Sequence, residues 1–270
     1  MVDLLLDVLA PAACPLCGSQ AARGPTRFCR RCARTFRAVA SPLCTCCGVP
    51  FAAAMADHPC GACVRQPPAF GAVRAGGRYE GGLLDSIHRL KFAGDIVQIT
   101  ALALLLVRAL RRLPRPHASR LQAAPSPHHV VLDARPPYDL VVPVPLHPRR
   151  IRERGFNQAH LLAAALLRGG RLASWAELAP DALIRTRETT PQTRLTRIAR
   201  QSNLRGAFRG RAERVRGRHV LLVDDVMTTG ATLDACARAL RRAGARRIDA
   251  VVTARAVAWS GEEVERGDRL

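Results

Sequence analysis

Lysine, aromatic residues and long apolar runs are all scarce in this chain of 270 residues. Lys91 is the only lysine among 42 basic residues, so the Gly-Lys-Ser/Thr ending of a Walker A loop is absent. Seven Phe, two Tyr and two Trp are too few for an extended surface on which nucleic-acid bases stack. The most apolar stretch, 99–107, ends at Arg108 and is too short to span a bilayer. We therefore expect neither a Walker-type nucleotide loop nor membrane insertion.

Acidic residues are also few, at 21 against 42 basic ones, which gives a net charge of +21. Such a charge favours polyanionic partners, such as phosphates or nucleic acid. Because Ala, Arg, Gly and Pro dominate throughout, many of the arginines are equally compatible with plain surface cations of a compositionally biased chain. The first residues include Asp3 and Asp7 and lack the basic region of a secretory signal, so we expect a cytoplasmic protein.

The ten cysteines follow a repeated pattern. Eight of them form four Cys-x2-Cys pairs, and the second two pairs repeat the first two at an offset of 30 or 31 residues: Cys14, Cys17, Cys29, Cys32, Cys44, Cys47, Cys60 and Cys63. Two such pairs close a tetrahedral Zn²⁺ site, so the duplication predicts two structural Zn²⁺ ions, each held within one repeat. Disulfides are the less favoured alternative in a chain without a signal. Cys46 is a spare or competing ligand, and Cys236 is a core cysteine.

The most informative segment is VLLVDDVMTTGATL at 220–233. Its apolar start, 220–223, predicts a buried parallel strand that ends at the carboxylates Asp224 and Asp225. The small, hydroxylated loop 228–232 opens an amphipathic helix, and its free N–H groups can bind a phosphate. The two carboxylates can accept hydrogen bonds from a vicinal diol, so one element suits both the 5′-phosphate and the hydroxyls of a ribose. The alternative is an ordinary strand–turn–helix with a solvated acidic pair.

The remaining apolar pattern alternates between strands and helices, which predicts an α/β fold with a mainly parallel central sheet flanked by helices. We expect strands at 72–80, 139–145, 183–185, 220–223 and 247–253, and helices at 83–92, 95–112, 157–168 and 232–243. Residues 1–66 form the Cys-rich module, 67–256 the α/β domain and 257–270 a polar tail. Within the domain, 113–137 is rich in Pro, Ala, His and Arg, and we expect it to be a flexible insertion.

These pieces together resemble the ComF family, competence-associated proteins that join a double zinc ribbon to a type I phosphoribosyltransferase-like domain. The resemblance covers nearly all of 12–255. Its motifs are, in order, CPLCG, CRRC, the second Cys quartet, YEGGLLDSIHRLKF, VPVPLHPRRIRERGFNQA, TPQTRLTR, NLRGAF and VDDVMTTGAT. It implies a type I phosphoribosyltransferase fold with an N-terminal double zinc ribbon of two four-cysteine sites, and phosphoribosyl pyrophosphate bound with Mg²⁺.

The same resemblance implies roles for individual residues. Asp224 and Asp225 would bind the ribose diol as the catalytic pair. The 5′-phosphate loop would comprise Val226, Met227, Thr228, Thr229, Gly230, Ala231 and Thr232. The pyrophosphate loop would comprise Pro143, Val144, Pro145 and Leu146, and a mobile catalytic loop within 186–205 would contribute Thr190, Gln192, Arg194 and Arg197. Arginines of 149–154 are candidates to clamp the pyrophosphate, and for each of them a solvated surface cation is an equal alternative.

Two functions remain open at this point. The first is an enzyme that transfers a phosphoribosyl group to or from an unidentified acceptor. The second is a non-catalytic competence protein that binds single-stranded DNA, acts with DNA-uptake proteins and uses the phosphoribosyl pocket as a ligand or nucleotide sensor. The intact acidic pair and phosphate loop favour retained ligand binding in either case.

Overall fold

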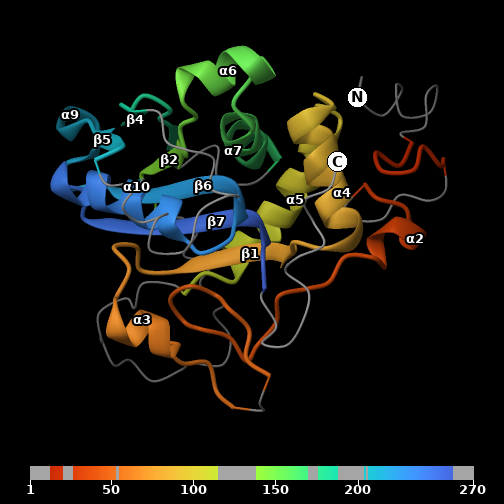
Figure 1. Cartoon of the computed structure of the whole chain (residues 1–270), viewed down its shortest axis with the longest axis horizontal. Coiled ribbons are helices and arrows are strands. Elements are labelled where there is room, and N and C mark those ends of the chain that lie inside the picture. Colours follow the sequence, from red (N-terminus) through yellow and green to blue (C-terminus); the bar gives the residue numbers. More distant parts are fainter. Residues whose placement is uncertain are drawn as a thin grey trace, which may run out of the picture.

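A five-stranded parallel sheet forms the centre of the computed structural model, which describes residues 13–20, 27–52, 55–114, 138–169, 176–187, 204 and 206–257 (Figure 1). Its strands, in spatial order, are β1 (Val73–Arg78), β7 (Arg247–Arg255), β6 (His219–Met227), β2 (Leu140–Pro143) and β3 (Glu177–Leu178). Every pairing within this sheet is parallel. The predicted α/β class with a mainly parallel sheet is therefore confirmed.

Helices cover both faces of this sheet. One face packs against α4 (Gly81–Phe92), α5 (Gln98–Arg111) and α7 (Gln158–Gly169), and it buries Leu221 and Val223 of β6. The other face packs against α10 (Ala231–Arg242) and an antiparallel pair, β4 (Leu183–Arg185) and β5 (Phe208–Gly210), and it buries Val220 and Leu222. Because alternate residues of β6 serve opposite cores, the strand reads as a continuous apolar run.

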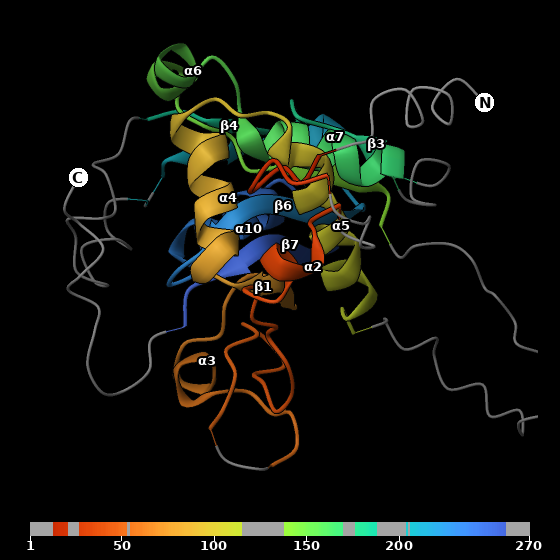
Figure 2. The same ribbon diagram turned by 90° about the vertical axis from the view of Figure 1, so that its right-hand side faces the viewer.

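Four short helices complete the described elements: α2 (Arg30–Ala33), α3 (Gly61–Arg65), α6 (Pro148–Arg154) and α9 (Ala212–Val215). The α2 segment lies beside α4 and α5, whereas α3 belongs to a lobe that extends below β1 (Figures 1 and 2). The two halves of the Cys-rich module thus occupy different positions on the α/β domain.

Several expected elements differ from the observed ones. The strand at 183–185 exists but pairs with β5 outside the main sheet, and the short α6, β3 and β5 were not predicted. Most importantly, β6 does not end at Asp224 but continues to Met227, because β7 runs on to Arg255 and the ladder between the two strands persists. The acidic pair therefore lies inside the last part of the strand, with its backbone held by the sheet.

Two sequence-based expectations lie largely outside the described residues, namely the insertion at 113–137 and the tail at 257–270. Within the described part, none of the helices is both long and apolar enough to cross a membrane. The limits of the Cys-rich module at 1–66 and of the α/β domain at 67–256 stay predictions.

Candidate functional site

The eight paired cysteines form two clusters, each closed within its own repeat. In each cluster the four sulfur atoms lie within 4.8 Å of one another. The distance from Cys17 Sγ to Cys29 Sγ is 3.7 Å, and that from Cys47 Sγ to Cys60 Sγ is 3.9 Å. A regular tetrahedron with Zn–S bonds of about 2.3 Å has edges of about 3.8 Å. These spacings fit Zn²⁺ and are far too long for disulfide bonds, so both quartets suit structural zinc.

Backbone N–H groups point at the cluster sulfurs, as thiolate ligands require. The amides of Cys47 and Cys60 lie 3.4 and 3.2 Å from Cys44 Sγ, and the amide of Cys32 lies 3.4 Å from Cys29 Sγ. Burial alone would raise the pKa of Cys44, but these N–H donors outweigh it and lower that pKa to about 6. Cys46 stands apart from the quartets, and Cys236 lies on the buried face of α10, in the core.

The predicted acidic pair lies at the carboxyl end of β6. Asp225 is 3% exposed, and its Oδ2 forms an ion pair with Lys91 Nζ at 2.9 Å. Asp224 is half-buried beside it, and desolvation together with the Asp225 charge raises the pKa of Asp224 to about 8. Asp225 is thus paired with a cation, whereas Asp224 has a raised pKa, and a ligand cation or diol can help to ionise its carboxyl group.

Lys91 is the site residue that our sequence analysis missed. It lies in the last turn of α4, and its side chain is 17% exposed while it reaches Asp225, which is far away in the sequence. Burial would lower the pKa of this ammonium group, but Asp225 more than offsets burial and raises it. The sequence did contain a sign of this role. Lys91 is the only lysine in a chain whose other strongly basic residues are all arginine.

Arg154, at the end of α6, is a second cation on this side. Its guanidinium carbon lies 5.8 Å from the centre of the Phe92 ring, and its Nη1 donates to Gln158 at 2.8 Å. Burial lowers the pKa of Arg154, and the charge of Asp225 opposes that change. The α4 and α6 ends thus place Lys91 and Arg154 in the electrostatic field of the acidic pair.

The predicted phosphate loop connects β6 to α10. Gly230 has φ of +82° and precedes the first helical residue, Ala231, so the loop turns sharply into the helix N-terminus. A Cβ at Gly230 would lie 2.5 Å from Met227 Cε, so this position excludes larger residues without a shift of Met227. Thr228 and Thr229 are exposed. The backbone there matches what close approach by a phosphate requires.

The predicted pyrophosphate loop leaves β2 next to that strand end. Pro143 pairs with Val223, and Val144 N–H donates to the Val223 carbonyl at 2.9 Å. Asn157 holds the turn by donating to the Val144 carbonyl at 3.1 Å. The only cis peptide bond among the described residues is Ser41–Pro42, so 143–147 is trans throughout. Pro145 and Leu146 follow directly, and the loop lies at the same edge of the sheet as Asp224.

The mobile-loop residues Thr190, Gln192, Arg194 and Arg197 lie outside the described residues. Of the arginines considered as a pyrophosphate clamp, Arg149 pairs with Glu153 at 2.9 Å on the exposed face of α6. Of the predicted site elements, the structure brings the acidic pair and the segments 226–232 and 143–146 to one edge of the sheet.

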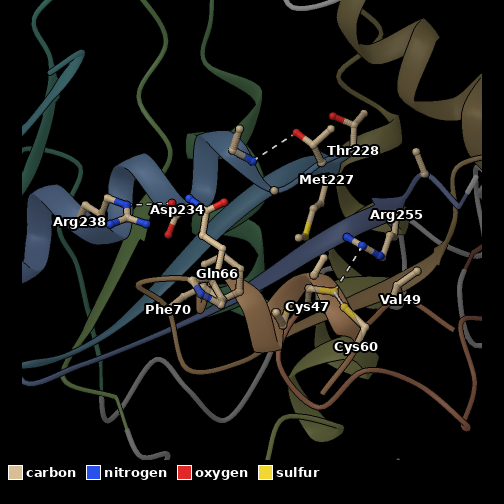
Figure 3. Close-up of a pocket in the computed structure, with 17 residues that line it drawn as sticks. Cys47, Val49, Cys60, Gln66, Phe70, Met227, Thr228, Asp234, Arg238 and Arg255 are labelled. Atoms are coloured by element: carbon tan, nitrogen blue, oxygen red, sulfur yellow. Dashed lines mark hydrogen bonds and ion pairs between the residues drawn. The ribbon is translucent and has the colours of Figure 1, made fainter. Parts of the chain in front are cut away.

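A cavity of about 290 Å³ opens on the β7 side of the phosphate loop (Figure 3). One wall is the second Cys quartet, represented by Cys47, Cys60 and Cys63, and another is the loop itself. Arg255, the last residue of β7, is 7% exposed and donates from Nη2 to Cys47 Sγ at 3.7 Å. Met227 and Phe70 contribute apolar surface.

Comparison with known proteins agrees with this architecture. Residues 5–64 match the double zinc ribbon domain, and residues 160–265 match the phosphoribosyl transferase domain. DNA utilization protein YhgH of Escherichia coli (strain K12) is 36% identical over 241 residues, which cover 88% of this chain and 94% of that protein. Competence protein F of Haemophilus influenzae is 33% identical over 205 residues, covering 74% and 80% of the two chains.

A shorter match links the chain to competence protein ComFC of Bacillus subtilis, which is 33% identical over 105 residues, or 39% of each chain. Among solved structures, the glutamine phosphoribosylpyrophosphate amidotransferase of B. subtilis overlaps 43% of this chain and 22% of its own, at 24% identity and a TM-score of 0.26. That overlap is too small to bear on the assignment, which rests on the sequence relatives. The paired Cys quartets, the parallel sheet and these relatives together show that the chain belongs to the ComF family.

Proposed function

We propose that the chain binds phosphoribosyl pyrophosphate with Mg²⁺ across the carboxyl ends of β6 and β2 and transfers the phosphoribosyl group to an acceptor. The observation that carries this proposal is the convergence of three ligand-binding elements at one edge of the parallel sheet. The acidic pair lies near the end of β6. The loop that turns at Gly230 leads into α10, and the loop 143–146 follows the end of the neighbouring strand, β2. Ligands of open α/β sheets bind at such an edge.

In this pose each element has a distinct task. The N–H groups of 228–232 hold the 5′-phosphate, and Asp224 and Asp225 accept hydrogen bonds from the ribose hydroxyls. As the bond from the ribose C1 to pyrophosphate breaks, positive charge develops on the ring, and the nearby carboxylates stabilise it. Lys91 pairs with Asp225 and orients it. Mg²⁺, when bound, neutralises charge on the departing pyrophosphate.

Titration calorimetry with phosphoribosyl pyrophosphate and Mg²⁺ tests this proposal. The double variant Asp224→Asn/Asp225→Asn should lose most of the affinity, since each charged hydrogen-bond acceptor contributes about 1.5–3 kcal/mol. Gly230→Val should also weaken binding, because a β-branched residue is strained at a φ of +82° and its Cβ would also displace the end of the Met227 side chain. Asp181→Asn is the matched control, because Asp181 pairs with Arg211 and Arg214 away from the site. Equal affinities in the double variant and the control would refute the assignment.

We also propose that this activity serves the use of DNA taken up by the cell. The names of the relatives, DNA utilization protein and competence protein F, support this role. A second candidate function, non-catalytic binding of single-stranded DNA, is favoured by the net charge of +21 and by the exposed arginines of α6. Affinity for an oligonucleotide should then fall steeply with salt, because phosphate contacts release counterions. Binding that is absent at low salt would leave only the first function.

A further inference from the structure

Four large apolar side chains are exposed at one corner of the α/β domain, where α4 ends, α5 begins and α6 lies alongside. They are Phe92, at 75% exposed, Ile96 at 59%, Val97 at 66% and Ile151 at 39%, and we call them the apolar corner. Elsewhere in the described part of the chain, only Met55 and Val64 are large apolar residues of comparable exposure. Large apolar residues that are gathered in this way, rather than scattered singly, mark an interaction surface.

The α6 helix joins this corner through Arg154. The Arg154 guanidinium carbon lies 5.8 Å from the centre of the Phe92 ring. Residues three apart on a helix share one side, so Ile151 is on the side of α6 that carries Arg154 toward Phe92. Figure 2 shows α6 next to the end of α4 from which Phe92 comes. The apolar corner is therefore one surface built from two separate parts of the chain.

Hydrogen bonds hold the connection between α4 and α5 in one conformation. Asp95 accepts from the Val97 N–H at 3.2 Å and from Gln98 Nε2 at 2.9 Å. Gln98 is fully buried, and it also bonds to Ser86 Oγ at 2.6 Å and to the Pro15 carbonyl at 2.6 Å. Because this network orders the connection before any partner arrives, binding there costs little conformational entropy.

Positive charge surrounds the apolar corner. Arg150 shares the side of α6 that carries Arg154, because the two residues are four apart, and Arg89 likewise shares the side of α4 that carries Phe92. Arg89 and Arg154 donate to neutral groups, a backbone carbonyl and a glutamine side chain. Within the described ranges, none of these three arginines forms an ion pair with an acidic side chain.

The acidic side chains close to the corner in sequence are already engaged or lie further away. Glu153 pairs with Arg149 at 2.9 Å, and both carboxylate oxygens of Asp95 accept hydrogen bonds from its own connection. The acidic residue of α4 is Asp85, which lies about two helical turns before Phe92. The surface thus combines exposed apolar groups with cations that are not neutralised locally. Its complement is an apolar surface that carries carboxylates.

An acidic protein helix fits this pattern better than a second copy, DNA or a lipid surface. A symmetric contact with a second copy would bring the same arginines together, and they would repel. DNA offers phosphates and stacking bases, but three of the four apolar side chains are aliphatic and do not stack on bases. Lipid headgroups offer charge without apolar anchors at a fixed spacing. An amphipathic helix presents apolar anchors and carboxylates in a fixed arrangement.

We propose that the apolar corner is the docking surface for an acidic amphipathic helix of a partner protein. The apolar side chains of that helix pack on the four residues of the corner, and its carboxylates pair with the three surrounding arginines. Because Lys91, immediately before Phe92, pairs with Asp225, the docked helix lies beside the candidate site. The chain would thereby hold a partner next to its ligand site, whether or not it transfers a phosphoribosyl group.

Fluorescence anisotropy with labelled synthetic helical peptides tests this proposal on the full, zinc-loaded chain. One peptide carries leucine at i, i+3, i+4 and i+7 spacing and glutamate elsewhere, and a second replaces every glutamate by lysine. The glutamate peptide should bind and the lysine peptide should not. Ile96→Ser/Val97→Ser should weaken binding by about tenfold or more, because large apolar side chains lose their burial. Val64→Ser is the matched control, because it removes a valine of nearly equal exposure, 64%, from the second ribbon.

A pair of charge reversals on α6 tests the arginines. Arg150→Glu should weaken binding of the glutamate peptide by about threefold to tenfold, because it removes one ion pair and adds a repulsion. Arg152→Glu is the matched control, because residues two apart on a helix do not share a side. Both residues are exposed, so neither change disturbs the core.

The proposal is overturned if the glutamate peptide does not bind, or if the variants and their controls bind it equally well. Without peptide binding, a loss in Ile96→Ser/Val97→Ser of self-association on sedimentation, of binding to anionic lipid vesicles or of binding to a single-stranded oligonucleotide would assign the corner to that occupant instead. Peptide binding that appears only after deletion of 258–270, which contains four acidic residues, would assign it to the chain's own segment.

Discussion

The first and second zinc ribbons share a Cys spacing, yet they contact different parts of the α/β domain. In the first ribbon, Pro15 accepts a hydrogen bond from Gln98 at 2.6 Å, and Thr35 Oγ1 accepts one from the Gly82 amide at 3.3 Å. Three of its four cysteines are buried, in the same core as α4. In the second ribbon, the Cys46 carbonyl accepts from Val73 N–H at 2.8 Å, and three of its four cysteines are only partly buried.

The two ribbons consequently reach the candidate site by different routes. The first ribbon packs on α4, and Lys91, at the other end of α4, forms an ion pair with Asp225. The second lies against β7, whose last residue, Arg255, contacts Cys47 at the cavity. A duplicated metal-binding unit has therefore become a support for a helix in one copy and a wall of a cavity in the other.

The largest expected effect comes from removing one cysteine ligand in each ribbon. Cys32→Ser should lower the melting temperature by ~10 °C or prevent folding, because the first quartet is part of the main core and metal binding contributes folding free energy. Cys63→Ser should lose one zinc ion as well, but with a much smaller change in melting temperature. Metal analysis and thermal unfolding on both variants check this. Equal destabilisation would erase the distinction between the ribbons.

The link from the first ribbon to the site can be broken at Lys91. Lys91→Met leaves the Asp225 carboxylate buried and unpaired, which should reduce the free energy of unfolding by about 3–5 kcal/mol. Lys91→Arg should cost less, and Lys91→Met/Asp225→Asn should recover part of the loss. Denaturant unfolding of wild type, Lys91→Met, Asp225→Asn and the double variant forms a double-mutant cycle. Additive losses in that cycle would mean that the ion pair contributes nothing.

The raised pKa of Asp224 predicts opposite pH dependences for ligand binding and for stability. In the proposed binding mode, phosphoribosyl pyrophosphate and Mg²⁺ need the Asp224 carboxylate, so affinity should rise by up to about tenfold per pH unit toward pH 8 and then level off. The unliganded protein favours the protonated acid, so its stability should fall as pH rises from about 4 to about 8. Asp224→Asn should remove both trends. Calorimetry and thermal unfolding across this pH range test both trends. A pH dependence that is unchanged in Asp224→Asn would mean that another group causes it.

The smallest expected effect concerns DNA. Arg30→Glu/Arg31→Glu reverses two exposed charges on the first ribbon, and Arg65→Glu reverses one on the second. If single-stranded DNA contacts either ribbon, the matching variant should reduce the slope of log affinity against log salt by about one per lost phosphate contact. Fluorescence anisotropy with a labelled oligonucleotide at several salt concentrations measures this slope. Unchanged slopes in both variants would place the contacts elsewhere.

Much of the fold could be predicted because its signals are local. The apolar run 220–223 identified the central strand, and the periodicity of 232–243 identified the helix that became α10. The end of β6 could not be predicted, because Asp224 and Asp225 remain in the ladder only through pairing with β7. Similarly, the segment 183–185 is a strand, but its partner, β5 at 208–210, is well separated from it in sequence.

By itself, the sequence determined the number and order of the Cys quartets, the strand–loop–helix of 220–233 and the parallel α/β class, because spacing and periodicity reflect neighbouring residues. The tertiary structure alone decided that Lys91 pairs with Asp225 and that Arg255 meets Cys47, across 208 positions. Such contacts depend on how the sheet and the ribbons pack. These contacts matter energetically because the side chains of Lys91 and Arg255 are largely buried, and a buried charged group is costly without a partner.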